Sequence, residues 1–97
     1  MPKSETYMVT PQAERYRAQL AKHFAHKIAV IEEEGTSRFI FPMGRGAASS
    51  ALGSLSLSAE ANGPEDLARV QQVLESHLLR FAYRETPPPL EWVSREE

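Results

Sequence analysis

Three histidines are the side chains best suited to chemistry in this sequence, because imidazole titrates near neutral pH and is a common metal ligand. His23 and His26 fall at the end of one predicted helix, and His77 falls in the last third of another. On a helix, residues three apart project about 60° from each other, so His23 and His26 could reach one ion. No acidic residue stands in the adjacent turn to complete the ligand set. We therefore predict no metal site and no cofactor, with His23 and His26 as the nearest approach to one.

Helical phase separates the three histidines. His23 comes seven residues after Tyr16 and His77 seven after Val70, so each flanks the apolar stripe of its helix, where a half-buried, hydrogen-bonded histidine is the simplest interpretation. His26 points away from its stripe and would cap the helix C-terminus. Four strands between the helices would make the second helix antiparallel to the first. We therefore expect His23 and His77 at opposite ends of the helix layer, and no site shared by three histidines.

Basic side chains form the second group of candidates. Arg80 and Arg84 lie late in the second helix, and Arg45 stands between two glycines in what reads as a tight connection, residues 44–46. Converging backbone amides and a guanidinium beside such a turn could hold a carboxylate or a phosphate. A solvated charge at a hairpin tip is the alternative for Arg45. The candidate ligand-binding residues are therefore His23, His26, His77, Arg80, Arg84 and Arg45.

Composition excludes several classes of function. The 97 residues include no cysteine, which rules out disulfides, thiolate metal sites and thiol nucleophiles. The sequence has no Gly-x-Ser-x-Gly elbow and no phosphate-binding loop. A net charge of -2 gives no field that would gather nucleic acid or an anionic membrane. No apolar run approaches the roughly 20 residues of a membrane span, and the polar N-terminus lacks a signal sequence, so we expect a cytoplasmic protein.

The first helix should follow a short β-compatible segment, residues 7–9. Thr10 followed by Pro11 is typical of a helix N-cap and a first helical residue. Apolar residues then recur at steps of three and four, which predicts a helix that ends near His26 or Lys27. Its buried stripe consists of Ala13, Tyr16, Leu20 and Phe24.

Strands are expected between the two helices. The clearest signal is in residues 54–61, where leucine and alanine alternate with serine and glutamate, so one face is buried and the other meets water. A polar turn at residues 33–36 should join the first two strands as a hairpin. The four expected strands are residues 28–31, 38–41, 47–52 and 54–61.

The second helix should begin at Pro64, after a cap at Asn62 or Gly63, and should fray before Thr86. Its buried stripe is Leu67, Val70, Leu74, His77, Leu78 and Phe81. Three prolines at 87–89 then favour an extended polyproline conformation. We expect one domain over residues 1–97, with a proline-rich C-terminal tail, residues 86–97, that Trp92 packs back on the body.

These elements predict an α+β fold. Its antiparallel sheet of four to six strands carries two helices on one face, in the order β-α-β-β-β-β-α plus a short C-terminal strand.

The two helix ends also carry a resemblance to a known family. The segments Lys22–Ile28 (KHFAHKI) and His77–Glu85 (HLLRFAYRE) resemble a bacterial family of domains of unknown function, numbered 2218. The resemblance extends to the strand and turn at 39–44, the alternating strand that ends at 60–61, and the tail with Trp92. It implies a TATA-binding-protein-like arrangement and an association with siderophore-interacting flavin reductases, hence with iron uptake. It supplies no catalytic residues.

From these patterns we expect a small cytoplasmic accessory or binding module of bacterial iron or siderophore handling. A binding module predicts a concave pocket with His23 or His77 at its wall. One alternative is a small enzyme that acts on a ferric siderophore or haem-like ligand, with His23 or His77 as acid, base or axial ligand. The other is a protein-docking domain that uses its open sheet face. The candidate partners are a siderophore-interacting flavin reductase and a second copy in a homodimer.

Overall fold

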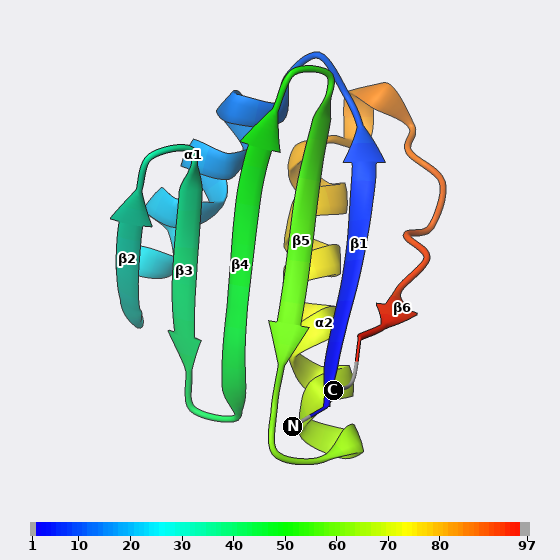
Figure 1. The fold of residues 1–97 in the computed structure, drawn as a ribbon. Helices are drawn as coiled ribbons and strands as arrows, with labels where there is room; N and C mark the ends of the chain where they lie inside the picture. The colour runs from blue at the N-terminus through cyan, green and yellow to red at the C-terminus, as the bar shows by residue number, and fades with distance from the viewer. Residues whose placement is uncertain (1, 96–97) are drawn as a thin grey trace.

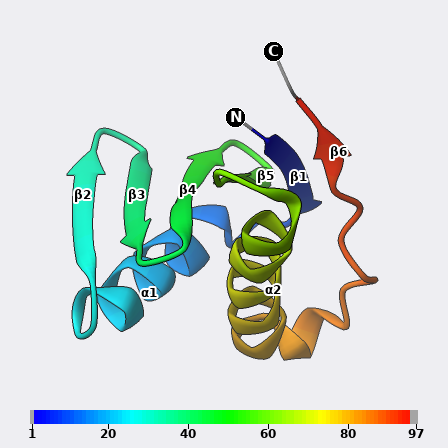
Figure 2. The ribbon, with the colours of Figure 1, turned by 90° about the horizontal axis from the view of Figure 1, so that it is seen from below.

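The fold is an antiparallel sheet of six strands with two helices on one face (Figures 1 and 2). The computed structural model describes residues 2–95. The elements are β1 (Lys3–Val9), α1 (Ala13–Ala25), β2 (Ala29–Glu33), β3 (Thr36–Phe41), β4 (Gly44–Ala51), β5 (Ser54–Glu60), α2 (Pro64–Phe81), a 3-10 turn (Tyr83–Glu85) and β6 (Val93–Ser94). The predicted fold class is confirmed, including the short C-terminal strand.

Strand order in the sheet is β2-β3-β4-β5-β1-β6. Three hairpins join β2 to β5 in sequence, and β1 then pairs with β5 along its whole length, from Lys3 opposite Glu60 to Val9 opposite Ser54. On its other side β1 pairs with the two residues of β6, at Ser4 and Glu5. Within residues 2–95, most of that edge of β1 therefore has no neighbouring strand.

The core lies between the sheet and the two helices. In β5, Leu55, Leu57 and Ala59 are buried while the alternating serines lie on the open face, as the period of two predicts. The predicted stripe of α1 is buried at every position, and in α2 the central residues Val70, Leu74 and Leu78 are fully buried. Figure 2 shows both helices beneath the same face of the sheet. Within residues 2–95 no helix combines the length and the apolar character needed to cross a membrane.

The start of α1 differs from the prediction. The helix begins at Ala13, with Gln12 as its N-cap residue, so Thr10 does not cap it. Thr10 instead extends the sheet, because its backbone N–H donates to the carbonyl oxygen of Gly53 at 3.0 Å. Its hydroxyl accepts the backbone N–H of Gln12, also at 3.0 Å, and so closes the turn before the helix. The strand before this turn is also longer than expected, because β1 starts at Lys3.

The glycine pair around Arg45 was expected to form a turn, and this is wrong. Both glycines lie in β4, and the β3–β4 turn is formed by Pro42 and Met43. A β-carbon on Gly46 would lie 3.0 Å from Cδ1 of Leu74, so the missing side chains let α2 approach β4 closely. The glycines therefore serve helix packing, and Arg45 is an exposed strand residue opposite Ile40 and Glu60.

Candidate functional site

The two helices bring His23 and His77 together, which corrects the expectation that they lie at opposite ends of the helix layer. Their ring centroids are 4.6 Å apart. The expectation assumed that α2 runs strictly antiparallel beside α1. Instead α1 packs mainly against β2, β3 and β4, and α2 packs against β4 and β5 (Figures 1 and 2). Ring contacts of His23 with His77 and Phe81, and of Phe24 with His77, join the last turn of α1 to the C-terminal part of α2.

The rings of Phe24 and Phe81 pack beside the histidine pair. We call His23, His77, Phe24 and Phe81 the histidine cluster. The centroid of His23 lies 5.3 Å from that of Phe24 and 5.9 Å from that of Phe81, both edge-on. The Nδ1 of His77 lies 2.7 Å from the carbonyl oxygen of Val73, to which the Nδ1–H tautomer donates. These contacts are those of packed residues at a helix–helix boundary.

Burial lowers the pKa of His23 below its ordinary value, and the nearby positive groups of His77, Lys27, His26 and Arg80 act in the same direction. The folded protein therefore favours a neutral His23. A neutral imidazole could ligate a metal, but the residues from 2 to 95 contain no group of three His, Asp or Glu side chains placed to hold an ion.

The other predicted site residues do not converge on one site. His26 is exposed and is the C-cap residue of α1. Arg84 is exposed, and its guanidinium donates to the hydroxyl of Tyr83 at 3.0 Å. Arg80 is exposed near the histidine cluster, whereas Arg45 lies on the open face of the sheet. The six candidates thus contribute one close pair, His23 and His77.

Two charged residues of α1, Glu14 and Arg17, are paired within the protein. The side chain of Arg17 donates to Glu14, to Glu32 at 2.8 Å and to the buried hydroxyl of Ser37 at 2.5 Å. The hydrogen bond from Arg17 is the main reason that the pKa of Glu14 falls to about 2, and a bond from Ser50 adds to it. This network joins α1 to β2, β3 and β4 and is structural.

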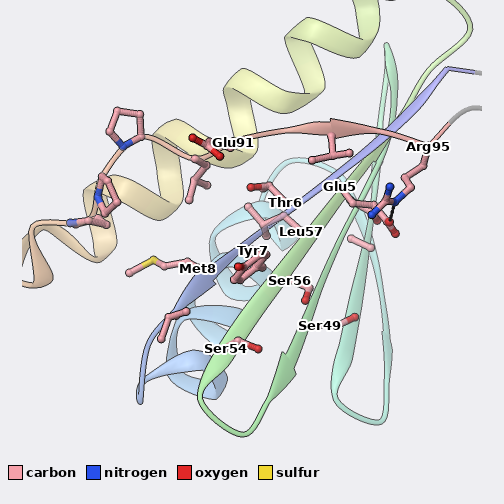
Figure 3. A pocket seen from close by; sticks show the side chains of 18 of the residues that line it. Glu5, Thr6, Tyr7, Met8, Ser49, Ser54, Ser56, Leu57, Glu91 and Arg95 are labelled. Atoms are coloured by element: carbon pink, nitrogen blue, oxygen red, sulfur yellow. Dashed lines mark hydrogen bonds and ion pairs between the residues drawn. The ribbon is translucent and has the colours of Figure 1, made fainter.

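A hollow lies elsewhere, between β1 and the C-terminal tail (Figure 3). We call it the strap groove and the tail residues 86–92 the strap. The groove has a volume of about 760 Å³. One wall is β1, the floor continues over the open face of β5 to Ala47 and Ser49 of β4, and the strap forms the opposite wall. A smaller groove of about 370 Å³ lies between the outer side of α2 and Trp92. Neither of these grooves has a histidine in its lining.

The strap is held away from β1 by α2. The carboxylate of Glu75 accepts the indole N–H of Trp92 at 2.9 Å and the backbone N–H of Leu90 at 3.3 Å. Both side chains also pack against the hydrophobic core. Beyond the strap, the backbone N–H of Arg95 donates to the carbonyl oxygen of Lys3 at 2.7 Å. The groove is thus spanned by a segment that is fixed at both ends.

Glu85 lies where the strap leaves the helix, and it contributes to the groove lining. One of its carboxylate oxygens, Oε2, accepts hydrogen bonds from Thr10, at 2.9 Å, and from the phenol of Tyr16. Burial, followed by the bond to Glu85, raises the pKa of Tyr16 to about 12. Tyr16 therefore keeps its proton near neutral pH and holds the Glu85 carboxylate in place.

The groove surface combines apolar side chains with hydroxyls, and its charged side chains are mainly acidic. The open-face hydroxyls are those of Ser49, Ser54, Ser56 and Ser58. Of its charged side chains, Glu5 is paired with Arg95 at 3.0 Å, while Glu85 and Glu91 add two further carboxylates. Such a surface can offer hydrogen bonds and attract a positive group.

The strap groove was not predicted from the sequence. The serine alternation predicts a wet sheet face, and the three prolines predict an extended tail, but neither pattern states that the tail spans the edge of β1. The signal that could have suggested it is Trp92, since a half-buried aromatic after a polyproline segment requires a return path across the body.

Comparison with known proteins identifies the family. Residues 5–93 match the family described as "Uncharacterized protein conserved in bacteria (DUF2218)", and the chain belongs to this family. The fold is similar to the NMR structure of PA4090 from Pseudomonas aeruginosa, with a TM-score of 0.79 at 24% identity. That alignment covers 98% of this chain and 96% of the other. No match is found among curated proteins.

Proposed function

We propose that the protein is a binding module that holds a neutral or cationic ligand in the strap groove. The observation that carries this proposal is the hollow of about 760 Å³ between β1 and a strap that Glu75 anchors. Ligand sites for small molecules have volumes of about 300–1,000 Å³ and combine apolar walls with a few fixed polar groups. Pro87, Leu90 and Val9 supply the apolar part, and serine hydroxyls supply the polar part.

Charge restricts the class of ligand. Because Glu5 is paired with Arg95, the net negative charge of the groove comes from Glu85 and Glu91. An anionic ligand would be repelled by both carboxylates, whereas a cation would be attracted. If the family's implied link to iron uptake extends to this chain, the ligand is therefore a neutral or cationic ferric siderophore of the hydroxamate kind, and an anionic tris-catecholate is disfavoured.

The two alternatives have less support. An enzyme that uses His23 or His77 requires an imidazole at a cavity wall, and neither described groove has one. A docking domain requires a contiguous apolar patch on the open sheet face. There the exposed large apolar side chains are divided between Tyr7 and Val9 on β1 and Ile31 and Ile40 on β2 and β3. Between them the open face carries serines and the small side chains of Ala47 and Ala51.

A nuclear magnetic resonance screen tests the proposal. Neutral, cationic and anionic fragments are added to ¹⁵N-labelled protein, and the shifts of the backbone amides are recorded. We expect neutral and cationic hits that shift the amides of Tyr7, Ser56 and Leu90. Hits confined to the amides around His23 and His77, or no hits at all, would overturn the binding-module proposal.

The siderophore assignment has its own test in the same assay. The diamagnetic gallium complex of the cationic hydroxamate desferrioxamine B replaces the ferric complex, and gallium enterobactin serves as the anionic control. We expect the hydroxamate complex to shift the groove amides and the anionic complex to leave them unchanged. Failure of both complexes, with fragment binding intact, would remove iron from the proposal but leave the groove as a binding site.

A further inference from the structure

The strap groove contains an unpaired stretch of sheet edge. In β1 the backbone N–H and C=O groups of the odd-numbered residues point away from β5. The carbonyl of Lys3 shows this, since it accepts from the N–H of Arg95, just after β6. Those of the even-numbered residues point to β5, since the carbonyl of Pro2 accepts from Ala61 and the N–H of Thr10 donates to Gly53. By this alternation the backbone groups of Tyr7 and Val9 point outward.

These outward groups have no partner strand among residues 2–95. The pairing of β1 with β6 covers only Ser4 and Glu5. No backbone hydrogen bond joins Tyr7 or Val9 to the described part of the strap. The N–H and C=O groups of these two residues therefore form a short template to which a further strand could add.

The described strap does not fill this edge itself. Pro87, Pro88 and Pro89 have no N–H to donate, and the N–H of Leu90 is directed to Glu75 on α2. The strap thus faces the edge across the groove without pairing with it. The three prolines that favour an extended strap therefore also offer no N–H group to the sheet edge.

We infer that the strap groove binds an extended cationic peptide segment, which adds to the sheet as a strand beside Tyr7 and Val9. This rests on the proposed function of the groove as a binding site, and it names a peptide as the ligand in place of the siderophore that the family resemblance suggests. Alternate peptide side chains would face the open side, beside Tyr7, and the inner side, where Met8, Leu57 and Leu90 line the hollow. Figure 3 shows Tyr7 and Met8 at the wall formed by β1, with Glu91 on the strap.

Charge indicates which peptides fit. Among the residues that the structure describes, two groove carboxylates have no ion pair: Glu85, just before the strap, and the exposed Glu91. A lysine or arginine in the peptide would meet these groups, and an acidic residue would be repelled. The favoured segment is therefore about four to six residues long, alternately apolar, with at least one basic side chain.

A panel of synthetic hexapeptides tests the inference on the full-length protein. The peptides alternate valine and threonine, with one lysine placed at each position in turn, and affinity is measured by fluorescence anisotropy. Two matched controls replace the lysine with glutamate or N-methylate alternate backbone amides. We expect binding by at least one lysine peptide and about tenfold weaker binding after N-methylation, because two backbone hydrogen bonds are lost.

Substitutions at the edge give the complementary result. Val9→Pro removes one outward N–H, and the side chain of Val9 is 74% exposed, so the fold should tolerate it. Val9→Thr keeps the N–H and is the matched control. Affinity should fall about threefold in Val9→Pro, since one backbone hydrogen bond is lost, and stay unchanged in Val9→Thr. Glu91→Gln should weaken the lysine peptides and leave neutral ones unchanged.

Several results would overturn the inference. These are equal binding of N-methylated and unmodified peptides, absence of binding by the whole panel, and a dimer of the protein that Val9→Pro dissociates. The last would make a second copy the occupant of the edge. If fragments still bind the groove while peptides do not, the inference fails and the proposed function stands; if neither binds, both fail.

Discussion

The histidine cluster and the strap groove are two regions with opposite properties. The cluster holds two histidines, a residue type often used in catalysis, yet its rings pack on one another, and the ring centroids of His23 and His77 are 4.6 Å apart. The groove is built from serines, prolines and glutamates, yet it contains a hollow of about 760 Å³ and an unpaired sheet edge. Reactive side chains are useful where a ligand can reach them. In this protein the accessible space is at the edge of β1, so we assign structure to the cluster and binding to the groove.

Removal of Phe24 should have the largest effect, because it tests whether the histidine cluster is part of the core. Phe24 is buried and contacts Phe39, Phe41 and both histidines of the cluster. We expect Phe24→Ala to lower the free energy of unfolding by about 3–5 kcal/mol, measured by urea denaturation. Leu52→Ala is the control, since Leu52 is fully exposed and should change it by less than about 0.5 kcal/mol. Similar values for the two variants would show that the cluster is not packed.

Removal of the Trp92 indole should lower the stability of the protein and weaken binding in the strap groove. The indole is half-buried and donates to Glu75, so Trp92→Ala should cost about 2–3 kcal/mol, less than a core aromatic, in the same urea experiment. Release of the strap should also broaden the amide signals of Leu90 and Val93. Trp92→Phe keeps the packing without the hydrogen bond and should fall between the wild type and Trp92→Ala. A strap that stays ordered in Trp92→Ala would contradict the role of the Trp92 indole as an anchor, since Glu75 still accepts from Leu90 in this variant.

The phenol of Tyr16 gives a smaller and more local effect. Tyr16→Phe removes its hydrogen bond to Glu85 but leaves the bond from Thr10. We expect a loss of about 1.5 kcal/mol, typical of a hydrogen bond to a charged group, measured by thermal unfolding with calorimetry. The buried ring should keep its packing. An unchanged stability would mean that Glu85 is held by other contacts.

The pH dependence of stability tests whether His23 is neutral in the folded protein. Because burial lowers the pKa of His23 in the folded state from its ordinary 6.5, the unfolded chain binds its proton more readily. Stability should be complete above pH 6.5 and fall as the pH drops toward 5, by at most about 1.4 kcal/mol per pH unit. His23→Gln should flatten this slope. The lowered pKa values of Glu14 and Glu32 act only at more acidic pH, since the ordinary value of glutamate is 4.5. A wild-type slope of opposite sign would contradict a half-buried, neutral His23.

Much of the fold could be predicted from sequence because it depends on local periodicity. The stripe from Ala13 to Phe24 and the alternation in β5 place their residues correctly. The Pro64 start of α2 is also found as predicted. The errors arose where tertiary contacts override local signals: Gly44 and Gly46 resemble turn residues but lie in a strand under α2, and Thr10 resembles a cap but bonds to Gly53 and Glu85.

The site was harder to predict than the fold. The proximity of His23 and His77 depends on where the two helices cross, which periodicity within each helix does not determine. The strap groove depends on contacts far apart in sequence, since Glu75 holds Leu90 and Trp92 fifteen or more residues away. Residue type pointed to histidine and arginine, whereas the hollow is determined by the path of the tail.

The measurement that tests the central claim most directly is the affinity of one groove ligand, either the best fragment or the best peptide, for three proteins: wild type, Trp92→Ala and His77→Gln. Circular dichroism first establishes that both variants are folded. The account predicts that Trp92→Ala weakens binding at least tenfold and that His77→Gln, despite its lower stability, binds within twofold of the wild type. Loss of binding in His77→Gln with full binding in Trp92→Ala would contradict it and return the site to the histidine cluster.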